Sequence, residues 1–378
     1  MSLPDKQRGA PGLIPLARNA WRIGNVMLSR RLGRPPGYLP VLLMFVSWRC
    51  NLRCRMCGVC ESTHAPEAFQ GELNTDQWRS VLDSAATRLG TSLISISGGE
   101  PLLRKDIYDL IRHGADMGMS VHICTNAVLL GVREAEQLRD AGVSTVSISL
   151  ESPDAALHDY LRGDNTHEAV VRAIRLLRET APNVRIGINY LITRRNYKDM
   201  PRMVAFAESL GVHQIKFAPI HTNLLHRHKA MEQYGDLLFT PEDQDNLKQE
   251  MEGLRRACAT SRLATTSDAF IAGIHRLYSD PEPFQCYAGY ALCAVSPSGQ
   301  VAPCCDMDSS FSVLERPLHE IWRDPAFHEL RRRVHHCEAT CWDTTNTELS
   351  LRLRPISMAS DLFRNWRDLR FYLGGKRQ

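Results

Sequence analysis

Residues 41–60 read VLLMFVSWRCNLRCRMCGVC, and this stretch decides how the rest of the chain is interpreted. It begins with an apolar run containing β-branched and aromatic residues, which predicts a buried strand. Cys50, Cys54 and Cys57 follow with C-x3-C-x2-C spacing. Three thiolates on one short loop are soft ligands that select an iron–sulfur cluster or zinc. Zinc would need a fourth ligand, which Cys60 can supply, whereas a cubane held by three thiolates leaves one iron open for chemistry.

A second strand leads into a glycine turn. Residues 92–97 (SLISIS) predict a strand, and Gly98, Gly99, Glu100 and Pro101 follow it directly. A glycine pair at the end of a strand allows the backbone to bend sharply and to approach a ligand closely.

The combination of C-x3-C-x2-C with a strand followed by Gly-Gly-Glu-Pro resembles the radical S-adenosylmethionine (SAM) superfamily. The helix predicted after the fourth strand begins HDYLRGDNTHEAVVRAI, which resembles the His-Asp-x-x-Arg-Gly helix of that family. The resemblance covers about residues 41–219. The strands expected within it are 41–47, 92–97, 122–126, 144–151, 185–192 and 214–219.

These strands alternate with helical patterns at residues 107–117, 135–142 and 169–179. Such alternation is typical of βαβ units and a parallel sheet, in which ligands bind at the carboxyl ends of the strands. All of the motifs above lie at such ends. The expected fold class is therefore α/β, a partial (β/α)6 TIM-like barrel with a small C-terminal cysteine-rich hairpin-plus-helix extension.

The resemblance implies that Cys50, Cys54 and Cys57 hold a 4Fe–4S cluster whose open iron binds SAM. One electron, from a donor such as flavodoxin or ferredoxin, then cleaves SAM to methionine and a 5′-deoxyadenosyl radical, which abstracts hydrogen from the substrate. The SAM contacts implied by the motifs are Gly98, Gly99 and Glu100 for the amino group, with Asn126, Ser149, Glu151 and Arg162 for the ribose and carboxylate.

Simpler roles remain open for several of these residues. Glu100 can cap the next helix, Asn126 can be a turn residue, and Arg162 can form a surface ion pair. Cys124 lies in an apolar strand and is expected in the core, because free cysteine is readily buried.

A second group of cysteines follows residue 280. Residues 294–297 and 299–302 flank a Pro-Ser-Gly turn, which predicts a hairpin, and residues 325–335 predict a helix. The group resembles the SPASM/twitch auxiliary-cluster extension of radical SAM enzymes. The full C-x2-C-x5-C-x3-C array is absent, so the shorter twitch form fits better. It would hold one auxiliary 4Fe–4S cluster, which would be the second iron–sulfur cluster of the chain. The expected ligands are Cys286, Cys304, Cys337 and Cys341, with Cys293 and Cys305 as alternatives.

A zinc site with the same four thiolates is the competing interpretation. Four protein thiolates would close an auxiliary cluster to substrate, which favours electron transfer and net oxidation. Three would leave an open iron that can hold the substrate.

The remaining features concern class and location. The 378 residues are 43% hydrophobic and 23% charged, which is ordinary for a globular protein. The longest apolar run, 41–46, is far too short to span a bilayer, and the N-terminus lacks a secretory signal. We therefore expect a cytoplasmic protein, in which twelve cysteines indicate metal or redox chemistry rather than disulfides.

The net charge of +4 is unevenly distributed. Residues 1–40 hold seven Lys or Arg against one acid, and residues 349–378 hold seven against two, so the body of the chain is mildly acidic. This distribution does not fit a nucleic-acid binder. The basic amphipathic ends either dock on the parent domain or contact a membrane surface peripherally.

The expected organisation is a basic N-terminal extension (1–40), a radical SAM barrel (41–225), a mainly helical connection (226–283), a twitch-like auxiliary domain (284–345) and a basic amphipathic C-terminal helix (346–378). The favoured function is a radical SAM oxidoreductase acting on a small-molecule or lipid-like biosynthetic substrate. A radical SAM maturase of a ribosomal peptide or protein is the first alternative, and a zinc-binding regulatory protein is the alternative from another class.

Overall fold

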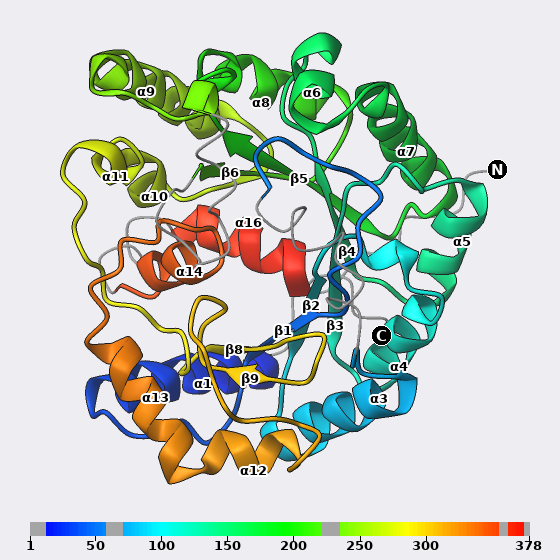
Figure 1. The fold of residues 1–378 in the computed structure, drawn as a ribbon, viewed down its shortest axis with the longest axis vertical. Coiled ribbons are helices and arrows are strands. Elements are labelled where there is room, and N and C mark those ends of the chain that lie inside the picture. Colours follow the sequence, from blue (N-terminus) through cyan, green and yellow to red (C-terminus); the bar gives the residue numbers. More distant parts are fainter. Residues whose placement is uncertain (1–12, 58–70, 221–234, 355–361, 374–378) are drawn as a thin grey trace.

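The computed structural model describes residues 13–57, 71–220, 235–354 and 362–373 (Figure 1). Cys60, the alternative fourth ligand, lies outside these residues. One curved sheet of nine strands organises the fold, in the order β7-β6-β5-β4-β3-β2-β1-β8-β9. The strands are β1 (Val41–Phe45), β2 (Leu93–Ser97), β3 (Ser120–Thr125), β4 (Thr145–Ser149), β5 (Arg185–Ile192), β6 (Gln214–Pro219), β7 (Ala264–Thr265), β8 (Leu292–Val295) and β9 (Val301–Ala302).

Helices surround this sheet in Figure 1, so that the β/α alternation becomes an open barrel. The six strands predicted for the barrel are all present, which confirms the partial (β/α)6 fold. The helices are α1 (Leu13–Arg31), α3 (Thr75–Asp83), α4 (Ile107–Asp116), α5 (Val132–Asp140), α6 (Ala155–Arg162), α7 (Thr166–Thr180), α8 (Met200–Ser209), α9 (Gln244–Thr260), α10 (Asp268–Gly273), α11 (Arg276–Ser279), α12 (Leu318–Arg323), α13 (Pro325–His335), α14 (Asn346–Arg352) and α16 (Leu362–Leu373).

The predicted hairpin of the cysteine-rich extension joins the barrel sheet. Strand β8 pairs with β1 in parallel, with Val41 opposite Leu292, and β9 then pairs with β8 in antiparallel fashion. The sheet thus continues across the predicted domain boundary at residue 284. The first cysteine loop follows β1, whereas Cys286 precedes β8 and Cys304 and Cys305 follow β9, so this three-strand part of the sheet connects the two cysteine groups.

The interior of the barrel is unusually polar. Side chains alternate along each strand, so Ile94 and Ile96 pack in the apolar core while Ser95 points the other way. Ser95 Oγ lies 2.8 Å from His122 Nδ1, and His122 Nε2 lies 2.8 Å from Ser147 Oγ. Burial, and next the charge of Lys216, lower the pKa of His122 to about 4, which keeps this ring neutral inside the barrel.

Helix α16 lies across the centre of the barrel in Figure 1 and contacts β3 and β7. Asp368 Oδ1 lies 2.8 Å from Lys216 Nζ and accepts a hydrogen bond of 2.6 Å from Gln214 Nε2. The Phe371 ring is buried close to the α-carbon of Gly187. Of the two interpretations of the basic C-terminal helix, docking on the parent domain is therefore the one that the structure realises.

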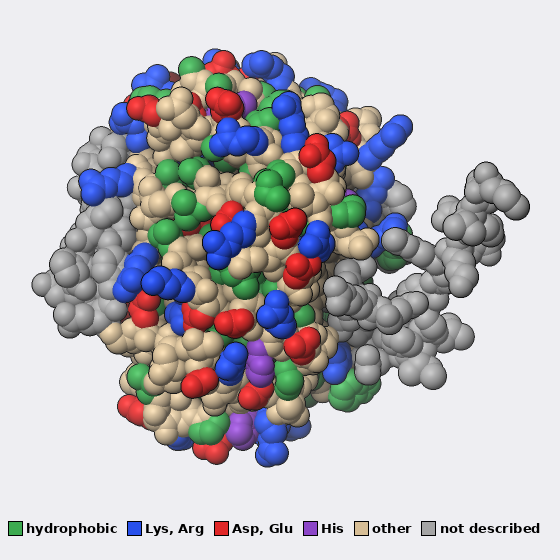
Figure 2. All heavy atoms as spheres, turned by 90° about the vertical axis from the view of Figure 1, so that its right-hand side faces the viewer, with side chains coloured by type: hydrophobic (Ala, Val, Ile, Leu, Met, Phe, Trp, Pro, Cys, Tyr) green, Lys and Arg blue, Asp and Glu red, His purple; other side chains and the backbone are tan. Residues whose placement is uncertain are grey.

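Two observations concern the surface. On the face shown in Figure 2, Lys and Arg side chains are interspersed with Asp and Glu. No helix among the described residues is long and apolar enough to cross a bilayer.

The packing of α16 yields a prediction for stability. Phe371→Ala should lower the free energy of unfolding by about 3 kcal/mol, because it removes a buried ring and leaves a cavity. Trp366→Ala on the same helix is the matched control, since half of its side chain is exposed, and it should cost much less. Urea unfolding measures both values, and equal losses would contradict this packing.

Candidate cluster and SAM site

A cavity of about 370 Å³ collects the predicted site residues at the carboxyl ends of the strands. The cysteine loop after β1 and the glycine turn after β2 form one side of it. Residues at the ends of β3 and β4 and on α6 form the other. The predicted residues that line it are Cys50, Cys54, Cys57, Gly98, Gly99, Asn126, Ser149, Glu151 and Arg162.

The cysteine thiols receive several N–H donors. Cys50 Sγ accepts from the backbone N–H of Leu52 at 3.4 Å and from Asn126 Nδ2 at 3.9 Å, and Cys54 Sγ lies 3.7 Å from Arg162 Nη1. Burial raises the pKa of Cys54 to about 11, although Arg162 opposes the shift. The Cys54 thiol is therefore protonated in the metal-free loop, and metal binding would release its proton.

The glycine turn is packed against the start of the cysteine loop. The backbone N–H of Gly99 donates to Ser47 O at 2.8 Å, and the N–H of Glu100 donates to Arg49 O at 2.7 Å. A Cβ on Gly98 would lie 2.2 Å from Ser47 O, and one on Gly99 would lie 2.2 Å from Arg49 O. Gly98 also has φ of +138°, which side-chain-bearing residues rarely adopt. The glycine pair therefore fixes the cysteine loop as well as facing the cavity.

The Glu100 side chain does not line the cavity. Its buried carboxylate accepts hydrogen bonds from Thr125 Oγ1 (2.7 Å), the backbone N–H of Asn126 (2.7 Å) and the backbone N–H of Leu102 (3.1 Å). Burial raises the pKa of Glu100 despite these donors. The capping role considered for Glu100 is thus present, and the same carboxylate positions Asn126 at the end of β3.

The His-Asp-x-x-Arg-Gly motif of α6 organises the opposite wall. Arg162 Nη2 lies 2.5 Å from Glu151 Oε1, in a pair with little exposure, and the same guanidinium reaches Cys54. His158 Nδ1 accepts the backbone N–H of Glu151 at 3.1 Å. Burial disfavours the charged Arg162, but Glu151 and Cys54 outweigh it and raise its pKa. The ion pair foreseen as a surface contact is therefore part of the cavity wall.

Within the same motif, Asp159 accepts the backbone N–H of Asn165 at 2.9 Å and that of His167 at 2.8 Å, at the start of α7. Gly163, which directly follows α6, has φ of +126°. These two residues therefore shape the connection from α6 to α7.

The cavity residues that sequence reasoning missed include Cys124, Asn189, Lys216 and Thr344. Cys124 was expected in the core, but it lines the cavity with Asn189 Nδ2 3.8 Å from its Sγ. The available signal was strand alternation, because Cys124 lies on β3 two residues before Asn126, which directly follows the strand, so both side chains are expected on one face. No local signal identified Thr344, which reaches the cavity from the segment after Cys341.

The second group of cysteines also converges. Cys286, Cys304, Cys305 and Cys341 pack in one cluster, and Cys337 is close enough to Cys286 to influence its pKa. Burial raises the pKa of Cys286 to about 12. Cys304, Cys305 and Asp306 place one ligand atom each within 4.8 Å of one another, so Cys305 remains a possible ligand.

Cys293 lies apart from this group. It is fully buried on β8 and belongs to the barrel core, whereas its neighbours Leu292 and Ala294 pack with the auxiliary cysteines. Because side chains alternate along a strand, Cys293 points to the other face of β8.

The donor sets fit iron–sulfur clusters. None of the cysteines in the described ranges forms a disulfide, and the auxiliary thiols receive N–H donors as the first group does. The backbone N–H of Ala288 lies 3.4 Å from Cys286 Sγ, and that of Asp306 lies 3.5 Å from Cys304 Sγ. Asn346 Nδ2 lies 3.8 Å from Cys305 Sγ. Such donors stabilise thiolate ligands and tune cluster potentials.

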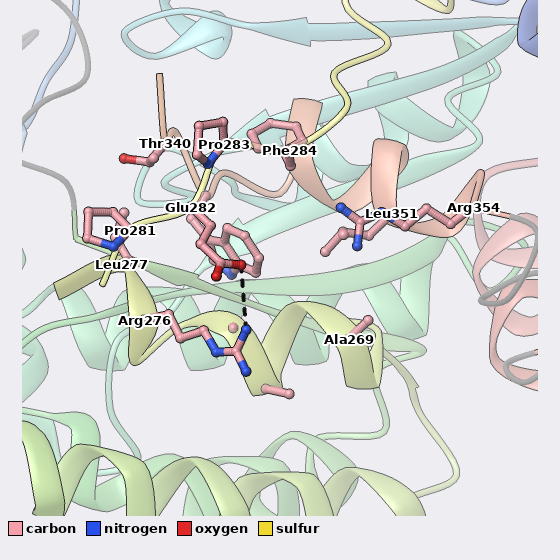
Figure 3. A pocket seen from close by; sticks show the side chains of 13 residues that line it. Ala269, Arg276, Leu277, Pro281, Glu282, Pro283, Phe284, Thr340, Leu351 and Arg354 are labelled. Carbon is pink, nitrogen blue, oxygen red and sulfur yellow. Dashed lines mark ion pairs between the residues drawn. The ribbon is translucent and has the colours of Figure 1, made fainter. Parts of the chain in front are cut away.

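A second cavity, of about 200 Å³, lies beside α10 and α11 (Figure 3). Phe284, Trp342 and the ion pair of Arg276 with Glu282, at 3.7 Å, line it. None of its lining residues is a cysteine, although Thr340 and Trp342 flank the expected auxiliary ligand Cys341.

Comparison with known families agrees with this geometry. Residues 44–207 match the model of the radical SAM superfamily. Residues 286–343 match that of an iron–sulfur cluster-binding domain, SPASM, and this range contains all four expected auxiliary ligands. The chain is a radical SAM enzyme with a C-terminal SPASM domain. This membership implies SAM, a 4Fe–4S cluster and an auxiliary cluster.

Curated relatives of this radical SAM enzyme include AdoMet-dependent heme synthases and PqqA peptide cyclases. It is 28% identical over 312 residues to an AdoMet-dependent heme synthase of Oleidesulfovibrio alaskensis, covering 78% of this chain and 77% of the relative. It is 28% identical over 306 residues to a PqqA peptide cyclase of Streptomyces rochei, covering 78% of each. A PqqA peptide cyclase of Granulibacter bethesdensis is 29% identical over 302 residues, covering 77% of this chain and 75% of the relative.

Solved structures share the fold. SuiB of Streptococcus suis bound to SAM superposes with a TM-score of 0.63 at 19% identity, covering 85% of this chain and 74% of SuiB. SuiB bound to its precursor peptide SuiA gives the same TM-score at 18% identity, covering 88% of this chain and 75% of SuiB.

The glycine turn yields a prediction for cluster binding. Gly99→Ala should reduce iron content after anaerobic reconstitution from about eight to about four per chain, because the cysteine loop must move away from the new Cβ. Gly24→Ala, on α1 with open space around it, is the control and should retain full iron. Full iron and unchanged SAM cleavage in Gly99→Ala would contradict the role of this contact.

The buried His158 yields a prediction for pH dependence. Burial, then Arg162 and His167, lower the pKa of His158 to about 3. In the unfolded chain the pKa is about 6.5, so the unfolded state takes up a proton first as the pH falls. The stabilisation is therefore complete above about pH 6.5 and decreases steadily below it.

His158→Asn keeps an acceptor for the Glu151 N–H but does not titrate. Between pH 7 and pH 5 the unfolding free energy of the native chain should fall by about 2 kcal/mol more than that of the variant. His336→Asn, at an exposed position, is the control and should follow the native profile. Parallel profiles for the native chain and His158→Asn would refute the lowered pKa of His158 as a cause of the pH dependence.

Proposed function

We propose that this chain is a radical SAM maturase that modifies a ribosomally made precursor peptide by net oxidation. The similarity to PqqA peptide cyclases carries this proposal, because it covers about three-quarters of this chain and of those relatives. The sequence favoured a small-molecule or lipid-like substrate, with a peptide as the alternative. The relatives support the peptide alternative better.

The arrangement of the cavity is consistent with this chemistry. When bound, the first cluster with SAM supplies a hydrogen-abstracting radical, and the auxiliary cluster supplies an electron acceptor. Glu151 and Arg162 present a fixed pair of charges to ligand hydroxyl and carboxylate groups on one wall. Thr344, three residues after Cys341, forms part of the same cavity. A substrate held there would lie next to the segment that carries the auxiliary ligands, as net oxidation requires.

A tetrapyrrole substrate is the second candidate. It is favoured by the 28% identity to AdoMet-dependent heme synthases over a comparable length. The two candidate functions differ in their substrate.

The test compares the two substrates directly. The reconstituted enzyme, SAM and a reductant are incubated with a synthetic peptide encoded next to its gene, or with an iron-porphyrin precursor of haem. The expected result is 5′-deoxyadenosine formation that depends on the peptide, together with a peptide product lighter by about two mass units per oxidation. Turnover of the porphyrin with an unmodified peptide would overturn the proposal.

Cysteine variants assign the two sites in this assay. Cys54→Ala should abolish 5′-deoxyadenosine, because the SAM-binding cluster loses a ligand. Cys286→Ala should retain SAM cleavage but lose the oxidised product. Cys258→Ala, a buried cysteine on α9 outside both groups, is the control. Unchanged product from Cys286→Ala would show that the auxiliary site has no part in the reaction.

A further inference from the structure

Arg30, near the end of α1, is a buried cation without a counter-ion in the described part of the chain. Only 4% of the residue is exposed, and it forms no ion pair with a described carboxylate. An unpaired buried charge is costly, because it loses hydration without gaining a compensating partner. The groups that surround Arg30 must therefore compensate for the cost of burying its charge.

Arg30 contacts the auxiliary site. Its Nε donates to the backbone oxygen of Cys286 at 2.5 Å, and its Nη1 lies 3.2 Å from His335 Nδ1. The guanidinium also lies 5.6 Å from the centre of the Tyr287 ring. Donation to this nitrogen requires the neutral ring, because a protonated histidine has no acceptor. The cation is thus held against the backbone of an expected cluster ligand.

The two cysteine sites differ in the charge that accompanies them. At the first site, Arg162 beside Cys54 is neutralised by Glu151. At the auxiliary site, Arg30 lacks such a partner among the described residues. Asp343 also lies at the auxiliary site, but its carboxylate accepts the backbone N–H groups of Thr345 and Asn346, each at 2.6 Å, and forms no ion pair with Arg30. A cluster held by thiolates is itself anionic, and it would supply the charge that Arg30 lacks.

We propose that Arg30 is a positioning residue for the auxiliary cluster, which orients Cys286 through its carbonyl and raises the reduction potential of the cluster through its positive charge. One-electron reduction adds one negative charge to the cluster, and a nearby cation stabilises that reduced form. The auxiliary cluster thereby becomes a better electron acceptor. This inference depends on the auxiliary cluster implied by the SPASM match and not on the class of substrate.

The test measures the auxiliary cluster alone. In full-length chain carrying Cys50→Ala, Cys54→Ala and Cys57→Ala, the remaining cluster is titrated electrochemically and followed by electron paramagnetic resonance. Adding Arg30→Gln should make the midpoint potential more negative, so that the ratio of reduced to oxidised cluster at the original midpoint falls about tenfold. Arg31→Gln removes the same charge from an exposed position on the same helix and should leave the midpoint nearly unchanged, because solvent screens it.

Arg30→Lys separates charge from structure. It should retain iron and sulfide and most of the original potential, because the positive charge remains. Loss of iron from Arg30→Gln but not from Arg30→Lys would also support the proposal. An unchanged potential in Arg30→Gln, equal shifts in Arg30→Gln and Arg31→Gln, or loss of the cluster from both Arg30 variants would overturn the electrostatic role.

Discussion

The contact between the glycine turn after β2 and the cysteine loop after β1 is the constraint on which the rest of the site depends. Two backbone hydrogen bonds join Gly99 and Glu100 to the oxygens of Ser47 and Arg49, at a separation that leaves no space for a Cβ. This close contact fixes the position of the backbone just before Cys50, and therefore the start of the loop that carries the three thiols. The same turn orients Glu100, whose carboxylate holds the end of β3, so three neighbouring strand ends are tied together.

The single sheet also connects this site to the auxiliary site. Because β8 pairs with β1, the strand that follows Cys286 lies beside the strand that precedes the first cysteine loop. Helix α1 supports the auxiliary side through Arg30. The barrel interior is closed by α16, where Lys216, Asp368, Glu348 and Arg352 form a buried network with balanced charges. This network joins the floor of the cavity to α14, which begins beside the auxiliary thiols.

Much of the fold and of the first site could be predicted because their signals are local. The six strands were visible as apolar runs, and the three cysteines and the Gly-Gly-Glu turn lie within short motifs at strand ends. Parallel pairing then requires those ends to meet on one side of the sheet. The helix motif around Arg162 could be recognised, but its partner Glu151 and its approach to Cys54 depend on the rotation of α6, which spacing does not specify.

The sequence by itself determined the chemistry of this protein, namely thiol groups at spacings suited to two metal sites on an α/β barrel. Only the tertiary structure decided which side chains complete those sites. Cys124 and Thr344 line the cavity, Cys293 leaves the auxiliary group, and Arg30 reaches Cys286 across 256 positions of sequence. The physical reason is that motifs encode local backbone geometry, whereas the burial and pairing of a charge depend on every element packed around it.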